Sequence, residues 1–168
     1  MSAHGQKMPS EQASLRPYTP EDFETLYEID QLCFAPGIAY TREDLRYYLR
    51  FPGADCVVAE ADGRIVGFYI SSHKDGKGYI ITIDVLVEYR RRGIGRLLLA
   101  ELERRLVAQG VRTVGLDTAT DNETAIAFWL KHGYRKRGLK KGYYPGGRDA
   151  FMMQKTLVTP STKNKRRH

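Results

Sequence analysis

The chain has 168 residues, a formal net charge of +7, 42% hydrophobic residues and 11% aromatic residues. This length and composition predict one folded domain and exclude a largely disordered chain. No apolar run approaches the roughly 20 residues that a membrane-spanning helix needs, and the first residues lack the apolar core of a signal peptide. We therefore expect a cytoplasmic protein with no membrane partner.

The ends of the chain differ from its middle. The last segment, STKNKRRH, is basic and has no acidic residue, so we expect a flexible tail at 159–168 and a flexible lead at 1–13. A single domain is expected between them, at 14–158. Cys33 and Cys56 lie in apolar segments, which favours two buried, reduced thiols over a disulfide or a metal pair.

The first third of the chain predicts one strand and two helices. SLRPYT is typical of a short strand. From Pro20 to Phe34 apolar residues recur with a helical period, after Thr19 as N-cap. The predicted stripe consists of Phe23, Leu26, Tyr27, Ile29 and Leu32. A second helix is expected over TREDLRYYLRF, with Thr41 as its cap and Asp44 in its first turn.

The period then changes to two, which predicts strands. Three segments show it: ADCVVAEA, GRIVGFYISSH and GYIITIDVLVE. They are joined by Asp-Gly at 62–63 and by DGKG at 75–78, and both are hairpin signals. A helix at 91–109, ended by Gly110, is expected to follow.

The last third predicts a strand, a helix and two further strands. The segments are VRTVGLDT, NETAIAFWLKH, GYRKRGLK and DAFMMQKTLV, with GYYPGGR as a turn or loop before the last. The element order is therefore β-αα-βββ-α-β-α-ββ. This order predicts one domain of the α+β class.

Three consecutive arginines precede two closely spaced glycines at the start of the 91–109 helix, in YRRRGIG. Glycines at a strand-to-helix junction allow a tight turn, and the first helical N–H groups favour a phosphate. The P-loop pattern is absent, and the dinucleotide fingerprint fails at Leu98. The pattern [RQ]xxGx[GA] fits Arg90, Gly93 and Gly95. The alternative is an arginine-rich helix start with no ligand.

The context of this pattern resembles the GNAT N-acetyltransferases over roughly residues 14–158. TIDVLVEYRRRGIGRLLL and DNETAIAFWLKHGYRKRG are similar to the family's two cofactor-binding motifs. GYYPGGRDAFMMQK resembles the last hairpin of N-terminal protein acetyltransferases, including the ribosomal-protein-alanine enzymes. FAPGIAY resembles their acceptor loop. The resemblance implies a GNAT fold, a mixed sheet splayed between its fourth and fifth strands.

The resemblance also implies that acetyl-CoA binds where the strands splay, without a metal. Backbone of Ile83, Asp84 and Val85 would pair with the pantetheine arm. The pyrophosphate loop would consist of Arg90, Arg91, Arg92, Gly93, Ile94, Gly95 and Arg96. Asn122 matches a cofactor-contacting residue, although an N-cap role fits it equally well. Trp129 shares its helix face and would also lie near the cofactor.

Acyl transfer to an amine needs a base and an oxyanion donor. By resemblance, Asp117 stands where the alanine acetyltransferases have a catalytic Glu, and Tyr79 is the competing candidate; Asp84 is a weaker third. The Val85 N–H would bind the oxyanion. Trp129 replaces the usual Tyr acid, and indole cannot serve in that role. The acceptor contacts implied are Phe34, Tyr40, Tyr143 and Tyr144.

The resulting hypothesis is acetylation of a protein N-terminal α-amine. A small amine or a lysine side chain is the enzymatic alternative, because one fold supports several substrates. A coenzyme A-binding protein without catalysis is another, which the Trp129 replacement keeps open. The basic tail and YRKRGLKKGYY suggest a nucleic-acid-binding alternative, but no zinc-finger or RNA-recognition motif supports it. The oligomeric state is left open.

Overall fold

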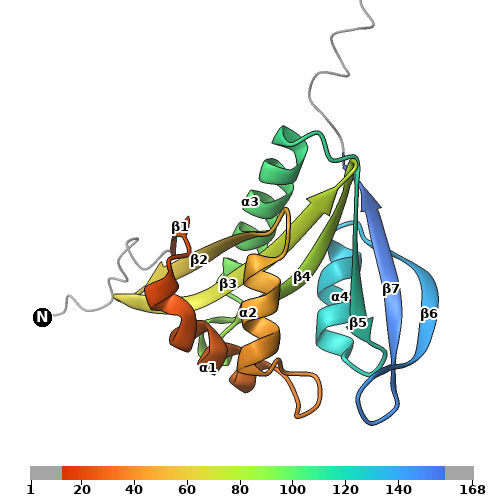
Figure 1. Cartoon of the computed structure of the whole chain (residues 1–168), viewed down its shortest axis with the longest axis horizontal. Coiled ribbons are helices and arrows are strands. Elements are labelled where there is room, and N and C mark those ends of the chain that lie inside the picture. The colour runs from red at the N-terminus through yellow and green to blue at the C-terminus, as the bar shows by residue number, and fades with distance from the viewer. Residues whose placement is uncertain (1–12, 158–168) are drawn as a thin grey trace, which may run out of the picture.

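The computed structural model describes residues 13–157, and its centre is a seven-stranded mixed sheet with helices on both faces (Figure 1). The strands are β1 (Ser14–Pro17), β2 (Asp55–Ala61), β3 (Arg64–Lys74), β4 (Lys77–Val85), β5 (Thr113–Ala119), β6 (Arg135–Tyr144) and β7 (Arg148–Thr156). The helices are α1 (Phe23–Cys33), α2 (Arg42–Arg50), α3 (Ile94–Ala108) and α4 (Glu123–Lys131), with short 3₁₀ turns η2 (Pro20–Asp22) and η3 (Val87–Tyr89).

The sheet has the order β1-β2-β3-β4-β5-β7-β6. Only the β4–β5 pair is parallel, and its pairing is confined to Lys77–Tyr79 against Thr113–Gly115. Beyond these residues the two strands diverge (Figure 1), which leaves the C-terminal half of β4 unpaired on that edge. This confirms the predicted fold class, element order and splay.

A β-bulge interrupts the pairing of β4 with β3. Ile70 is opposite Thr82 and Ser71 is opposite Ile80, so Ile81 is an extra residue on β4. Side chains alternate between the faces of a strand, and an extra residue shifts that alternation. A Cβ at Gly78 would touch Leu106 of α3, whereas Asp84, an even number of residues later, faces α1.

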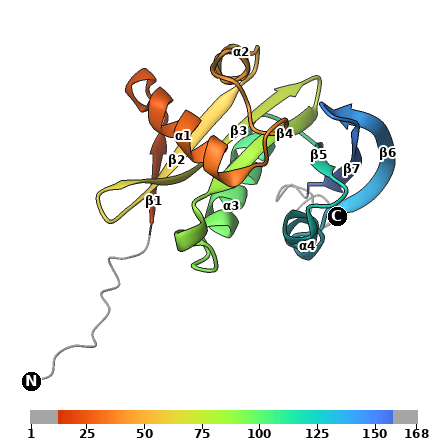
Figure 2. The ribbon, with the colours of Figure 1, turned by 90° about the horizontal axis from the view of Figure 1, so that it is seen from below.

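The helices form two layers around the sheet. Figure 2 shows α1 and α2 on one face and α3 and α4 on the other. Fully buried side chains fill both spaces, including Leu26 of α1, Leu45 of α2, Leu98 and Leu102 of α3, and Phe68 of β3. Within residues 13–157, no helix is both long enough and apolar enough to span a membrane.

The structure corrects several predicted details. Leu32 is 72% exposed and does not belong to the buried stripe of α1, because it lies roughly 100° around the helix from Cys33. Helix α3 begins at Ile94 and not at residue 91, since Arg91 and Gly93 have positive φ values of 67° and 81°. β6 extends to Tyr144, so the turn expected over 142–148 is shorter.

The remaining expectations concern caps, thiols and chain ends. Thr41 caps α2 as predicted, accepting from the Asp44 N–H. Cys33 and Cys56 are both free thiols and partly buried. Residues 1–12 and 158–168, which hold most of the predicted lead and the basic tail, lie outside the described part of the chain.

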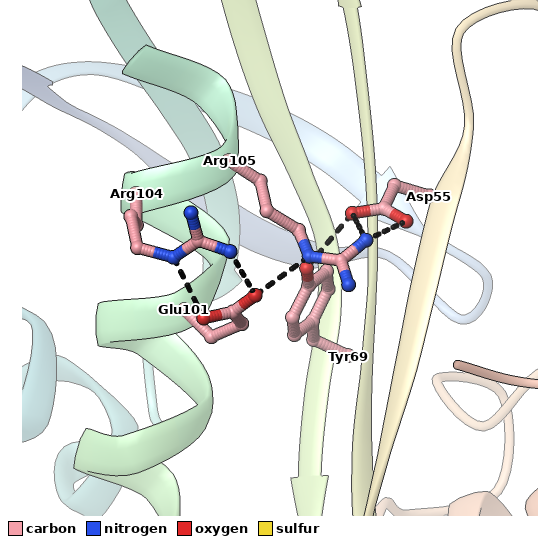
Figure 3. Close-up of polar contacts among 5 residues, drawn as sticks. All are labelled: Asp55, Tyr69, Glu101, Arg104 and Arg105. Atoms are coloured by element: carbon pink, nitrogen blue, oxygen red, sulfur yellow. Dashed lines mark hydrogen bonds and ion pairs between the residues drawn. The ribbon is translucent and has the colours of Figure 1, made fainter. Parts of the chain in front are cut away.

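An ion-pair network ties α3 to β2 and β3 (Figure 3). The Asp55 carboxylate accepts from the Tyr69 hydroxyl at 2.8 Å and from Arg105 at 3.1 Å, while Arg105 also donates to Glu101 at 2.7 Å. Arg104 completes the network and, with Arg105, lowers the pKa of Glu101 to about 2. The stabilisation from Glu101 is therefore retained at neutral pH and lost as the pH falls toward that value.

Helix α3 offers a matched pair of leucines that tests the assignment of its buried face. Leu98 is fully buried and Leu97 is 40% exposed. We expect Leu98→Ala to lower the free energy of unfolding by about 2–5 kcal/mol, because it leaves a cavity in the core. Leu97→Ala should change it by about 0.5 kcal/mol or less. Equal losses in urea unfolding would show that this face is wrongly assigned.

Candidate active site

The side chain of Asp117 lies on β5 next to the point where β4 and β5 separate. The Tyr79 hydroxyl, on the last β4 residue paired with β5, donates to Asp117 Oδ2 at 2.5 Å. The Asp117 side chain is only 3% exposed. The two candidates for the base, Tyr79 and Asp117, are thus parts of one hydrogen-bonded pair.

Lys140 completes this group, and sequence reasoning missed it. Its Nζ lies 3.1 Å from each oxygen of Asp117, with hydrogen-bond geometry only toward Oδ2. Lys140 is opposite Ala150 on β7, and Ala150 is opposite Ala119 on β5. Paired residues share a face, so the small alanines let the lysine reach across β7. Only the strand order β5-β7-β6 reveals this contact.

Tyr79 acts in this pair as a hydrogen-bond donor. Burial raises its pKa well above the ordinary value of 10, and the hydrogen bond to Asp117 raises it further. The phenol therefore stays protonated at neutral pH and cannot accept a proton there. Asp117 is the member of the pair that can.

Two segments that are distant in the sequence meet beside Asp117. The Tyr144 hydroxyl lies 3.5 Å from the Asp117 carbonyl oxygen, and its ring packs edge-on against Tyr143. From the α1–α2 loop, Tyr40 donates through its hydroxyl to the Ile81 carbonyl at 3.2 Å. A Cβ added to Gly37 of that loop would be 3.6 Å from the Pro145 carbonyl oxygen of the β6–β7 turn. The loop and the hairpin therefore lie against each other.

Phe34 is the remaining predicted acceptor contact. It is partly buried and forms the C-cap of α1, with its N–H bonded to the Asp30 carbonyl. Acceptor contact by Phe34, as by Tyr40, Tyr143 and Tyr144, stays a prediction.

The glycine-containing loop before α3 has the backbone shape of an anion site. Gly93 is the N-cap of α3, with φ 81° and ψ 8° and no side chain to cap the helix. The first N–H groups of α3, from Ile94 onward, have no acceptor within the helix. The end of the Arg96 guanidinium would lie 3.1 Å from a Cβ at Gly93. A cation at the positive end of the helix dipole favours a bound anion.

The other arginines of this loop differ in what they contact. Arg90 Nε donates to the Val85 carbonyl at 2.9 Å, and the Arg92 guanidinium lies 4.7 Å from the centre of the Tyr89 ring. Arg91 is exposed in a left-handed conformation. The arginine run is thus held partly by internal contacts, and Arg91 and Arg96 are the side chains left for a pyrophosphate.

The free edge of β4 has the arrangement expected for a pantetheine partner. Pairing with β5 has ended before Ile83, so this edge is open up to Val85. The Leu86 N–H bonds to Val66 of β3 at 2.9 Å, and alternation directs the preceding N–H, of Val85, away from β3. The side chain of Asp84 is buried toward α1, and its role as a base stays a prediction.

Asn122 and Trp129 of α4 have structural roles. Asn122 is the N-cap, and its Oδ1 accepts from the Ala125 N–H at 3.1 Å. Trp129 is 8% exposed and packs edge-on against Phe128 and Tyr134, with ring centres 5.1 and 5.2 Å away. Cofactor contact by either residue stays a prediction.

The sequence is similar to those of known proteins. The family model described as the acetyltransferase (GNAT) family matches residues 23–134. An uncharacterized N-acetyltransferase of Methanocaldococcus jannaschii is 33% identical over 142 residues, covering 84% of this chain and 90% of the relative. An N-alpha-acetyltransferase of Saccharolobus solfataricus is 29% identical over 159 residues, covering 86% of this chain and 93% of the relative.

A solved structure shows the same fold. The ribosomal-protein-S18-alanine N-acetyltransferase of Escherichia coli superposes with a TM-score of 0.79 at 23% identity, covering 88% of this chain and 95% of the other. The family match over residues 23–134 and the 33% identical relative lead to one conclusion: the chain belongs to the GNAT family of acetyltransferases.

Proposed function

We propose that the protein transfers the acetyl group of acetyl-CoA to the α-amine of a protein N-terminus. The observation that carries this proposal is the meeting of the α1–α2 loop with the β6–β7 hairpin beside Asp117. In this arrangement the two segments could border an extended peptide, with its terminal amine directed toward the Asp117 carboxylate. The name of the Saccharolobus relative, an N-alpha-acetyltransferase, supports the same acceptor.

The residues present fit acetyl-CoA. The open edge of β4 at 83–85 offers backbone groups to the pantetheine amides, and the N-terminus of α3 offers N–H groups to the pyrophosphate. Arg91 and Arg96 add positive charge beside these groups. Bound in this way, acetyl-CoA would supply an activated thioester near the splay, on the side where Asp117 lies.

The acceptor amine must lose a proton before or during attack. An α-amine with a pKa of about 8 is mostly protonated at pH 7, and Asp117 is the proposed acceptor of that proton, through a water molecule. Its Oδ2 is already bonded to Tyr79 and Lys140, whereas Oδ1 has no hydrogen-bond donor among the described residues. Oδ1 is buried and lies 3.1 Å from Lys140 Nζ, but it keeps a free lone pair. We therefore assign the proton transfer to Oδ1, with the water molecule entering together with the acceptor.

Lys140 compensates the buried charge of Asp117, which would otherwise be costly in a site that is nearly closed to water. Because its charge is balanced within this ion pair, we assign Lys140 the role of holding the Asp117 carboxylate in place and no direct effect on the incoming amine.

The remaining steps involve the thioester. Attack by the nitrogen on the carbonyl carbon forms the C–N bond and an oxyanion, to which we assign the Val85 N–H. Collapse of the oxyanion breaks the C–S bond and releases a thiolate. A thiol with a pKa of about 8.5 leaves readily and can take its proton from water, so the absence of an acidic group on Trp129 does not block the reaction.

Mass spectrometry of peptides tests the acceptor directly. Two versions of one lysine-containing peptide library, with free and with blocked α-amines, are incubated with the protein and acetyl-CoA. The proposal expects one acetyl group only on the free α-amines. Acetyl on the lysines of both versions would instead assign the protein to side-chain acetylation, and transfer only to small amines would exclude protein acceptors.

The base assignment leads to a kinetic prediction. Asp117→Asn keeps the size of the side chain and removes the carboxylate, so kcat should fall by about 10²–10⁴-fold, the usual effect of a positioned base. The Kd of acetyl-CoA, measured by calorimetry, should stay within a small factor of the wild-type value. A variant with undiminished kcat would contradict the assignment.

Tyr79→Phe is the matched comparison, because it removes only the hydroxyl that bonds Asp117. Since Tyr79 stays protonated, we expect a smaller loss of kcat than in Asp117→Asn, on the order of one neutral hydrogen bond, or about 10-fold. If Tyr79→Phe lost more activity than Asp117→Asn, the proton acceptor would lie on β4.

The loop before α3 leads to a binding prediction with an internal control. Gly93 and Gly110 both have positive φ, 81° and 83°, at opposite ends of the helix. Valine strains both positions similarly, so both variants should unfold at lower temperature. Only Gly93→Val should weaken acetyl-CoA binding, because it alters the turn that presents the N–H groups. Equal affinities in calorimetry would refute the loop assignment.

A further inference from the structure

Two buried carboxyl groups meet between α1 and β4, outside the catalytic group described above. Asp30 of α1 and Asp84 of β4 are each 1% exposed. Helix α1 contacts β4 at this point, since Cys33 Sγ, one turn after Asp30, lies 3.4 Å from the carbonyl oxygen of Val85, the neighbour of Asp84. Each carboxyl group shifts the pKa of the other, as expected for side chains that face each other. The meeting depends on the bulge at Ile81, which turns Asp84 toward α1.

Only two of the four carboxyl oxygens of Asp30 and Asp84 accept a hydrogen bond from the described residues. The Thr82 hydroxyl donates to Asp84 Oδ1 at 2.5 Å, and the Tyr40 N–H donates to Asp30 Oδ2 at 2.7 Å. Asp30 Oδ1 and Asp84 Oδ2 have no donor among the described residues. Two ionised carboxylates left in this condition would be strongly destabilising.

Within residues 13–157, no cation neutralises both carboxyl groups. The titratable or charged neighbours are Cys33 on α1, Tyr40 in the α1–α2 loop, Cys56 on β2 and Arg90 after β4. Of these only Arg90 is positive, and its Nε is engaged with the Val85 carbonyl. One proton between the two oxygens would satisfy both at once.

We propose that Asp30 and Asp84 share a single proton, with the Asp84 acid donating to the Asp30 carboxylate, and that this pair positions Tyr40 for the acceptor. The Asp30 carboxylate accepts from the Tyr40 N–H, and the Tyr40 hydroxyl donates to the carbonyl oxygen of Ile81, the bulge residue. The Gln31 side-chain amide donates to the Tyr40 carbonyl oxygen at 2.6 Å. The pair is thus the link between α1, β4 and the loop, and the acceptor part of the inference rests on the proposed function.

The shared proton predicts in which direction the stability of the folded chain changes with pH. Burial raises the pKa of Asp84 well above its ordinary value, and the adjacent Asp30 raises it further. The folded chain therefore retains a proton that the unfolded chain has lost, so the free energy of unfolding decreases as the pH rises above about 4. Loss of that proton would leave two adjacent negative charges and push α1 away from β4.

Thermal unfolding between about pH 5 and about pH 9 tests the proton. In Asp84→Asn the amide supplies a permanent N–H to Asp30, so this dependence should disappear. Relative to that variant, the wild-type Tm should fall by about 3–5 °C per pH unit. Parallel profiles would overturn the proposal, and so would a wild-type Tm that rises with added Na⁺ or Ca²⁺ but not in the variant, since a cation would then bridge the pair.

Asp22→Asn is the matched control for this measurement. Asp22 is also a buried aspartate, but its hydrogen bond with Arg16 lowers its pKa. Its contribution is therefore lost only as the pH falls below the ordinary range of a carboxyl group. Its profile should run parallel to that of the wild type between about pH 5 and about pH 9. A slope altered as much as in Asp84→Asn would show that the effect is not specific to the pair.

Acceptor kinetics test the positioning role. Asp30→Ala removes the acceptor of the Tyr40 N–H, so the KM for an acceptor peptide should rise by about 10–100-fold, with little change in the Kd of acetyl-CoA. Asp30→Asn keeps an oxygen that can accept from that N–H, so its KM should stay close to the wild-type value. An unchanged KM in a folded Asp30→Ala protein would overturn the positioning role. If no peptide is acetylated at all, the proposed function fails, and the unfolding profiles still decide the shared proton.

Discussion

The extra residue Ile81 on β4 is the constraint on which most of the site depends. It shifts the alternation of the strand, so that Tyr79 and Asp84 face the same side although they are an odd number of positions apart. It leaves a carbonyl that Tyr40 can bind. It also lies where β4 has already parted from β5, so one irregularity borders both the proposed cofactor edge and the proposed acceptor loop.

Charge compensation organises the rest of the site. Asp117 is nearly buried yet is balanced by Lys140 and bonded to Tyr79. The arginines that crowd the start of α3 are separated by internal contacts, Arg90 with a carbonyl and Arg92 with an aromatic ring. Among the residues that the structure describes, Asp30 and Asp84 have no such cation, which is why a proton is the proposed solution there.

Sequence reasoning predicted the elements that depend on neighbouring residues. Thr41 caps α2 and the hairpin turns lie at the predicted Asp-Gly positions, because caps and turns are decided by local backbone chemistry. The start of α3 was wrong by three residues, since the left-handed Arg91 cannot be distinguished from a helical residue by its type. The prediction that Leu32 is buried was wrong, because apolar residues alone do not define where the buried face of a helix ends.

The sequence by itself determined the fold class, the order of the elements and the approximate position of the site, since periodicity, glycines and the arginine run are local signals. Only the tertiary structure decided which side chains meet there. Lys140 reaches Asp117 across an intervening strand, and Asp30 meets Asp84 through a bulge. Such contacts depend on strand order and on the shift of one residue in register, and a shift of one residue sends a side chain to the opposite face of the sheet.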